Sequence, residues 1–532
     1  MRNNIKILDC TLRDGGYVNN WEFGENTICS IINKLIDANI DIVECGFLSE
    51  TKKSSCNSSI FNSLRPINKI LESASKKNDF ACMINYGEFP IEALPKYSGN
   101  GIDTIRIAFH KKDLKHALDF CQQVKEKGYS VFVQPMITAS YNEKELKILI
   151  EAINSFIPTS IYIVDSFGTL RKNELLSLFQ FFDKNIKQNI EIGFHSHNNL
   201  QLSFSNAQEL IQNQTSRMLI IDSSVFGMGR GAGNLCTELL LLHLNENFNK
   251  DYCILPILEI IDEFLNPIFI KKPWGYSVPY YIASTNNCHP NYASYLTDKQ
   301  TLSTKDVNLI LSQIPQENKN QYCQNIIEEL YVNHLSQRID DSENINKLTS
   351  IIGQKPILII APGKTIKTHE KAIKEHIEKI HPLILAINFV PDNFNSNIIF
   401  ISNLKRFSSL TDNQKEQLTT NNTIIATSNI GNVIENSLSI NYHSLIDPKY
   451  TEIDNAGIML LRLLKKMGIK EVSIVGYDGF KNNPHDNYYS DSMINTTNTE
   501  ILNDRNSCIS AQIKELQKTM HIHFLTPSLY IE

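Results

Sequence analysis

The sequence of 532 residues lacks the features that mark several classes of protein. It has no long basic run, and its 51 Lys and Arg stand against 57 Asp and Glu, which argues against nucleic acid as the main partner. No apolar stretch approaches the roughly 18 residues of a membrane span. The N-terminus shows no apolar core of a signal peptide. We therefore expect a cytoplasmic protein without a membrane span.

Closely spaced cysteines, internal repeats and low-complexity tracts are also missing. The 11 cysteines are scattered and never spaced as C-x-x-C, which excludes a zinc ribbon and a disulfide framework. With 42% hydrophobic and 20% charged residues, the chain is globular and has a large core. Its length exceeds that of one ordinary domain, so at least two folding units are expected.

The first half of the chain alternates short apolar strands with longer segments of helical period. Eight βα units within about 245 residues, with strands apolar enough to be buried on both faces, predict a (β/α)₈ TIM barrel. A doubly wound open sheet is the alternative that periodicity leaves open. The eight expected strands are residues 5–10, 42–47, 79–84, 103–109, 130–136, 160–165, 191–194 and 218–222.

The rest of the chain divides into two parts. Residues 251–350 have helical character and predict an extension that covers or flanks the barrel mouth. A new series of apolar strands then predicts a second α/β domain of Rossmann-like type, with strands at 357–361, 383–388, 398–402, 423–427 and 472–476. We thus expect a barrel domain over 1–250, the extension over 251–350 and the Rossmann-like domain over 351–532.

Polar residues that can perform chemistry follow the ends of two predicted barrel strands, where the active site of such a barrel lies. Arg13 and Asp14 come after the first strand, and His195 and His197 come at the seventh. In extended backbone the i, i+2 spacing directs both imidazoles to one side. Together with Asp14 they would form a two-histidine, one-carboxylate metal site. The same H-x-H spacing recurs at 521–523 without such a loop, where alternation in a terminal strand explains it.

At this point the chain resembles a known family. Five motifs, in order, make residues 5–250 similar to the DRE-TIM metallolyases, which include pyruvate-class aldolases, hydroxymethylglutaryl-CoA lyases and isopropylmalate-type synthases. The motifs are TLRDG at 11–15, the Glu of VECGF at Glu44, VDSFG at 164–168, GFHSHNN at 193–199 and GMGRGAGN at 227–234.

The resemblance implies a divalent metal on Asp14, His195 and His197, with Asn234 as a further ligand or a neighbour of the ligands. Mn²⁺ or Mg²⁺ is the expected cofactor, and Co²⁺ or Zn²⁺ also suits these ligands. Arg13 would face the enolate formed when a carbon–carbon bond next to a carbonyl breaks. Glu44 is expected to pair with Arg13, or alternatively to be a structural charge.

The residues after Asp14 differ from those of the family's branches. Condensing synthases and thioester lyases usually carry Gln, and hydroxy-oxo-acid aldolases carry His, where this chain has Tyr17. A phenol with a pKa near about 10 is a poor base, so Tyr17 would orient a water, bind substrate or pack. His289, in the helical extension, is a second acid/base candidate if its segment folds over the barrel mouth, with a surface loop as the alternative.

Several other positions are expected to line the pocket or the second domain's crevice. Arg106 would bind a substrate carboxylate or form a structural ion pair, and substrate contacts are expected from Gln134, Thr138 and Asp165. The turn at Gly363 and Lys364 could bind an anion but is not a Walker A loop. Asp478 follows a strand end and suits a ligand crevice. This half is faintly similar to Rossmann-like domains of sialyltransferase-type glycosyltransferases; the alternative is a structural domain.

These features predict a metal-dependent aldolase or lyase that acts on a 4-hydroxy-2-oxo acid. The enzyme would form this acid from pyruvate and an aldehyde, or cleave it into them. A sugar-derived aldehyde and surface-carbohydrate metabolism are the suggested setting. One alternative is a Claisen-type acyl-CoA condensing enzyme or lyase on the same barrel. Another is a bifunctional protein whose C-terminal domain binds a nucleotide sugar or transfers a glycosyl group. Small molecules are the expected partners, and a homo-oligomer is left open.

Overall fold

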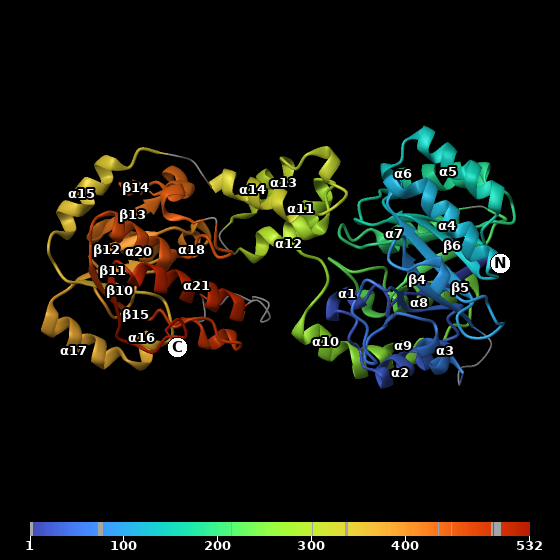
Figure 1. Cartoon of the computed structure of the whole chain (residues 1–532), viewed down its shortest axis with the longest axis horizontal. Coiled ribbons are helices and arrows are strands. Elements are labelled where there is room, and N and C mark those ends of the chain that lie inside the picture. Colours follow the sequence, from blue (N-terminus) through green and yellow to red (C-terminus); the bar gives the residue numbers. More distant parts are fainter. Residues whose placement is uncertain are drawn as a thin grey trace. The chain divides into compact units, whose positions relative to one another are not determined.

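The computed structural model describes residues 4–72, 78–213, 215–299, 302–335, 339–434, 436–447, 449–490, 493 and 502–531. By its internal packing the chain divides into two compact units, Met1–Ala293 with Gln316–Tyr322 and Ser294–Pro315 with Cys323–Glu532. Figure 1 draws both along the chain, from blue to red. Among the described helices, none is long and apolar enough to cross a membrane.

The first unit is built on a closed parallel barrel. β1 pairs in parallel with both β9 and β2, so the ring is closed and the open-sheet alternative is excluded. All eight predicted strands are confirmed within one or two residues. They are β1 (Ile5–Asp9), β2 (Ile42–Leu48), β4 (Asp79–Asn85), β5 (Thr104–Phe109), β6 (Ser130–Pro135), β7 (Ser160–Asp165), β8 (Glu191–Ser196) and β9 (Leu219–Ser223). The short β3 (Ile60–Phe61), which extends the sheet from β2, was not predicted.

Amphipathic helices follow the strands and bury one apolar stripe each. In α2 (Glu25–Asp37), for example, Ile28, Ile31, Ile32 and Leu35 are buried. Asn142 begins α5 (Glu143–Phe156) with a capping box, because its side chain accepts from the Glu145 amide. The others around the barrel are α3 (Arg65–Leu71), α4 (Leu114–Glu126), α6 (Lys172–Asn185), α7 (Ser203–Gln212) and α8 (Thr237–Phe248). A one-turn helix, α1 (Gly16–Asn19), follows β1.

The stretch predicted to be helical is helical, and its helices are shared between the two units. α9 (Leu255–Ile260), α10 (Asn266–Lys271) and α11 (Val278–Thr285) belong to the barrel unit. α13 (Thr304–Ser312), α14 (Gln324–Leu335) and α15 (Ser342–Ile352) belong to the second unit, and α12 (Pro290–Asp298) spans the division. A functional division at residues 250 and 350 stays a prediction.

The second unit is α/β with one parallel sheet, as predicted. Its strands are β10 (Ile357–Ile360), β11 (Leu383–Ile387), β12 (Ile398–Ile401), β13 (Thr423–Thr427), β14 (Leu438–Ile440), β15 (Glu471–Val475) and β16 (His521–Phe524). The terminal strand expected around 521–523 is therefore confirmed. β14 was missed, because it has three residues and only one of them is buried.

The strand order of this sheet is β14-β13-β12-β11-β10-β15-β16. The chain moves outward from β10 to β14 and then returns to continue on the other side of β10. The order therefore reverses between β10 and β15, and such a switch point opens a crevice at the carboxyl ends of the strands. The longer helices of this unit include α17 (Glu370–Ile380), α20 (Ala456–Lys466) and α21 (Leu502–Gln517) (Figure 1).

Candidate active site

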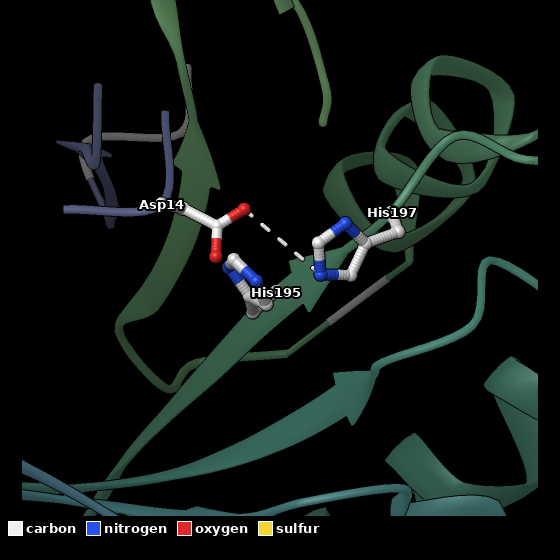
Figure 2. Close-up of side chains that lie close together, drawn as sticks. All are labelled: Asp14, His195 and His197. Carbon is white, nitrogen blue, oxygen red and sulfur yellow. Dashed lines mark ion pairs between the residues drawn. The ribbon is translucent and has the colours of Figure 1, made fainter. Parts of the chain in front are cut away.

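Asp14, His195 and His197 come together at the carboxyl end of the barrel. Asp14 lies in the loop after β1, His195 lies in β8 and His197 follows it directly. Figure 2 shows the carboxylate and the two imidazole rings directed toward one another. One possible ligand atom from each residue lies within 4.8 Å of the others. All three side chains are buried, so the cluster is a candidate metal centre, as the sequence predicts.

Local backbone contacts hold these residues in place. The Asp14 amide donates to the Cys10 carbonyl oxygen at 2.8 Å, and the His197 amide donates to the Asp165 carbonyl oxygen at 3.1 Å. Gly168 has φ +60°, and a Cβ there would lie 2.6 Å from the His197 carbonyl oxygen. Only glycine allows the loop after β7 to approach His197 this closely.

The ionisation of the cluster suits a cation. Burial would raise the pKa of Asp14, but Arg13 and then His197 and His195 outweigh it, so its pKa lies well below the usual range. Burial, more than any neighbour, lowers the pKa of His197 to about 3. At neutral pH the site therefore offers a carboxylate and an unprotonated imidazole, which are the forms that bind a divalent metal.

Asp222, at the end of β9, orients His195. Burial would raise the pKa of Asp222, yet Arg106 and His195 lower it, so it is a carboxylate. Nδ1 of His195 lies 2.9 Å from Asp222 Oδ2 and must donate to it, which leaves Nε2 for a metal. The sequence analysis missed Asp222, although a carboxylate at the carboxyl end of a barrel strand was the available signal.

Asn234 supplies a test of whether the cluster fits a metal. Its Nδ2 donates to Asp14 Oδ2 at 2.6 Å, while its Oδ1 is buried and has no hydrogen-bond partner among the described residues. A Cβ at Gly229 would lie 2.3 Å from Asn234 Nδ2, so this glycine permits the approach. An unpartnered amide oxygen beside a carboxylate and two imidazoles fits a divalent cation that takes oxygen and nitrogen ligands.

Arg13 is held by Glu44, as predicted, and keeps one donor available. Its Nε donates to Glu44 Oε2 at 2.9 Å, and its Nη1 contacts Asp14. Its Nη2 is buried with no partner in the part of the chain that the structure describes. A buried guanidinium N–H without an acceptor is costly, so this position favours an anionic oxygen of a bound molecule.

Glu44 also pairs with Arg106, which lies in β5. Arg106 Nη1 donates to Glu44 Oε2 at 2.7 Å, Nη2 contacts Asp222, and the side chain is fully buried. The buried core of the site thus contains three carboxylates, Asp14, Glu44 and Asp222, and two guanidinium groups. A divalent cation would reverse the excess negative charge and make the site attractive to a 2-oxo acid anion.

The other predicted pocket residues are engaged within the protein. With its amide oxygen toward Arg106, Gln134 accepts from Nε and Nη2 at 3.2 and 3.0 Å. The Thr138 hydroxyl donates to the Pro135 carbonyl and accepts from the Val164 amide. Asp165 accepts from the Thr169 and Leu170 amides, and burial raises its pKa to about 6. Their contacts position the loops around the candidate metal centre, and direct substrate contacts by them stay predictions.

Tyr17, His289 and Arg230 form a second cluster at the barrel mouth. The Tyr17 ring lies 4.6 Å from that of Trp21, and burial raises its pKa, so it is a poor base. The guanidinium carbon of Arg230 lies 5.5 Å from the Tyr17 ring centre, and its Nη1 lies 3.3 Å from Nε2 of His289. His289 thus lies beside a residue of the loop after β9, and its chemical role stays a prediction.

The charge of Arg230 affects His289 directly. Burial and then Arg230 lower the pKa of His289 to about 3, so the imidazole is neutral, with Nε2 beside Arg230 Nη1 and Nδ1 beside the Asn291 amide at 3.2 Å. No carboxylate within 4.0 Å pairs with Arg230 in the described ranges. The sequence analysis missed Arg230 as a site residue, although it lies inside the GMGRGAGN motif; a lone Arg in a glycine-rich loop was the only signal.

The candidates in the second unit also lie near one another. A Cβ at Gly363 would lie 2.3 Å from the Gly476 carbonyl oxygen, so this turn packs tightly on the β15 loop. Lys364 pairs with Asp486, and Asp478 accepts from the Thr365 amide at 2.8 Å. Lys364 is thus neutralised within the protein, and its role in anion binding stays a prediction.

Sequence comparisons identify relatives of the barrel. Residues 4–252 match the HMGL-like family. The 4-hydroxy-2-oxovalerate aldolase of Bacillus cereus is 26% identical over 267 residues, which cover 50% of this chain and 76% of the relative. The enzyme of the same name from Geobacillus thermodenitrificans is 27% identical over 268 residues, with the same two coverages.

Solved structures similar to this chain include a lyase and a domain of a proposed aldolase. The N-terminal domain of a proposed aldolase from Bacteroides vulgatus is 28% identical, has a TM-score of 0.48 and covers 56% of this chain and 98% of its own. The HMG-CoA lyase of Bacillus subtilis is 14% identical, has a TM-score of 0.40 and covers 51% of this chain and 94% of its own.

Proposed function

The barrel of this chain belongs to the HMGL-like, DRE-TIM metallolyase family, and on that premise we propose that the protein is a metal-dependent pyruvate aldolase. It would cleave or form the bond between C3 and C4 of a 4-hydroxy-2-oxo acid. The observation that carries the proposal is the buried cluster of Asp14, His195 and His197 beside the unpartnered Nη2 of Arg13.

In the cleavage direction a base takes the proton of the 4-hydroxyl group, the C3–C4 bond breaks, and its electrons reach the 2-oxo oxygen as an enolate. Arg13 Nη2 would donate to this oxygen, with Glu44 fixing the guanidinium. A divalent cation at Asp14, His195 and His197, with Asn234 beside it, would polarise the same carbonyl group. Manganese and magnesium are the cofactors we propose, since these ligands bind either metal.

We assign the base role to His289 and an anion-binding role to Arg230. The neutral imidazole can accept a proton, but its pKa of about 3 makes it a weak base. An anionic group bound to Arg230 would cancel the repulsion between Arg230 and a protonated His289, which is the second cause of the shift after burial, and would so raise the pKa of His289. Tyr17 supports Arg230 through its ring face and leaves the base role to His289.

The pairing of Arg230 with His289 implies an aldehyde substrate that carries negative charge. A guanidinium without a carboxylate partner recognises a carboxylate or phosphate group best. That the aldehyde is a sugar derivative used in surface-carbohydrate metabolism stays a prediction. A Claisen-type reaction with an acyl-CoA has no comparable support, because Tyr17 stands where the condensing enzymes carry Gln.

The test is pyruvate release from 4-hydroxy-2-oxoheptanedioate, whose cleavage gives the anionic aldehyde succinic semialdehyde, by the full chain loaded with Mn²⁺, followed with lactate dehydrogenase and NADH. We expect release that disappears on chelation and in Asp14→Asn, and no thiol release from acetyl-CoA with 2-oxo acids. Unchanged release from metal-stripped protein would exclude the mechanism. Thiol release in place of pyruvate release would favour the Claisen alternative.

A further inference from the structure

The second unit contains a cavity of about 180 Å³ at the carboxyl edge of its sheet. Its walls come from the segments that follow four neighbouring strands, at Ala361–Gly363 after β10, Asn388 after β11, Ser402 after β12 and Gly476–Phe480 after β15. β10 and β15 are the strands between which the strand order reverses. The cavity therefore lies where open parallel sheets form their ligand crevice.

Glycines allow the floor of this cavity to form. Gly476 has φ +69°, and a Cβ there would lie 2.1 Å from the Ala361 carbonyl oxygen. A Cβ at Gly457, in the first turn of α20, would lie 2.6 Å from the Tyr477 ring. The loop after β15 therefore packs against Ala361, and the start of α20 packs against Tyr477, more closely than any residue with a Cβ would permit. Polar side chains then line the cavity next to these glycines.

Three cationic side chains line the cavity: Lys299, Arg406 and Arg505. Arg505 is neutralised, because its Nε donates to Glu452 at 2.8 Å. Arg406 donates from Nη1 to the Met493 carbonyl oxygen and lies 4.7 Å above the Tyr488 ring, and Lys299 donates to the Thr451 carbonyl oxygen. Neither has a carboxylate within 4.0 Å among the residues that the structure describes. Two positive charges are therefore available to an anion.

A buried carboxylate in the same lining has the opposite preference. Asp454 is 9% exposed, and its Oδ2 accepts from the hydroxyl groups of Tyr331 and Tyr442. Its Oδ1 makes no hydrogen bond within the described ranges. Two phenol groups fix the side chain, so Oδ1 can accept from a ligand hydroxyl without losing side-chain entropy on binding. Asn388 and Ser402, both buried, add neutral polar groups to the lining.

From this arrangement we propose that the cavity binds a phosphorylated sugar, either free or as part of a nucleotide. Arg406 and Lys299 would bind the phosphate, since guanidinium and ammonium groups are the usual partners of phosphate oxygens. Asp454 would accept from sugar hydroxyl groups. A plain anion would leave Oδ1 of Asp454 without a donor, and a neutral sugar would leave both cations without an anionic partner, which is why the ligand combines the two groups. The inference concerns the second unit and is independent of the aldolase proposal.

The test is calorimetric titration of the full chain with inorganic phosphate, ribose, ribose 5-phosphate, and the monophosphates of adenosine, guanosine, cytidine and uridine. We expect a phosphorylated sugar to bind at least about tenfold more tightly than phosphate or ribose. Heat from ribose 5-phosphate alone would identify a free sugar phosphate, and tighter binding of one nucleotide would identify a nucleotide. No heat from any of these probes, or equal affinity for phosphate alone, would overturn the proposal.

Variants assign any binding to this cavity. Arg406→Met should weaken binding about tenfold or more, Arg406→Lys should restore part of it, and binding should weaken as salt is added. Asp454→Asn should weaken the binding of the sugar phosphate and leave that of inorganic phosphate unchanged. Lys405→Met, which removes an exposed charge on the same helix, is the matched control, and thermal unfolding followed by circular dichroism reports the folding of each variant. Binding that neither Arg406→Met nor Asp454→Asn changes would place the ligand elsewhere and overturn the proposal.

Discussion

Nδ1 of His195 donates to Oδ2 of Asp222 at 2.9 Å, and the same carboxylate contacts Arg106. One carboxylate therefore joins the candidate metal centre to the arginine network inside the barrel. Through it, the orientation of His195 depends on residues that do not touch the proposed metal.

Asp222→Asn should weaken metal binding about 10- to 100-fold, because the amide orients His195 less strongly and lowers its basicity. Competition with a chromogenic chelator measures the dissociation constant for Mn²⁺. Asp183→Asn is the control, since Asp183 also pairs with an arginine of the barrel unit, Arg217, at 2.9 Å but contacts no candidate ligand. Equal metal affinity in both variants would show that Asp222 does not support the site.

Glu44→Gln should destabilise the barrel by about 3–5 kcal/mol, since it leaves Arg13 and Arg106 buried without their shared carboxylate. The chain has two tryptophans, Trp21 and Trp274, and both lie in the barrel unit. Tryptophan fluorescence during urea unfolding therefore follows that unit alone. Glu143→Gln, which breaks an exposed pair with Lys147, should change stability by less than about 1 kcal/mol. A similar small effect of Glu44→Gln would contradict the buried network.

Arg230→Met should lower kcat/KM about tenfold or more for aldehydes that carry a carboxylate or phosphate. It should not slow the reaction of neutral aldehydes such as propanal, because only a charged substrate loses its partner and because loss of the Arg230 charge raises the pKa of His289. The measurement is the rate of condensation with pyruvate, compared between succinic semialdehyde and propanal. Arg230→Lys should retain part of the preference, and an equal loss for both aldehydes would indicate that Arg230 only shapes the mouth.

The stability of the barrel should depend on pH through His289. Its pKa falls from 6.5 to about 3 on folding, chiefly by burial and then by Arg230. Between these pH values the unfolded chain binds a proton at His289 that the folded chain does not. The free energy of unfolding therefore decreases as the pH falls below 6.5. The wild type should therefore lose more unfolding free energy between pH 7 and 4 than His289→Gln does. Parallel curves from tryptophan fluorescence would show that the pKa of His289 is not lowered by folding.

The sequence predicted the barrel because its strands are mostly apolar and its catalytic motifs lie at or near strand ends. β2, for example, is buried at all seven positions and carries Glu44 among them. The metal cluster followed from the same logic, since Asp14 follows β1 and His195 lies near the carboxyl end of β8, and the ring brings these two strand ends to one face. By contrast, β14 contains too few apolar residues to be distinguished from a loop.

Residues whose partners are distant in sequence could not be assigned from patterns alone. Whether Arg106 binds substrate or protein depends on Asp222, 116 residues away, and on Glu44. The proximity of Arg230 to His289 depends on how a helical segment folds, which periodicity does not encode. The cavity of the second unit likewise depends on the strand order, and its lining extends from Lys299 to Tyr530.

The central claim is that Arg13 and a metal at Asp14, His195 and His197 stabilise the enolate of pyruvate. The most direct measurement is the loss of the pyruvate methyl signal in proton NMR in D₂O, because exchange requires the enolate but no aldehyde. The account predicts exchange with the Mn²⁺- or Mg²⁺-loaded full chain, and its fall by at least about a hundredfold on chelation, in Asp14→Asn and in Arg13→Met. Exchange that continues unchanged in metal-stripped protein or in Asp14→Asn would contradict it.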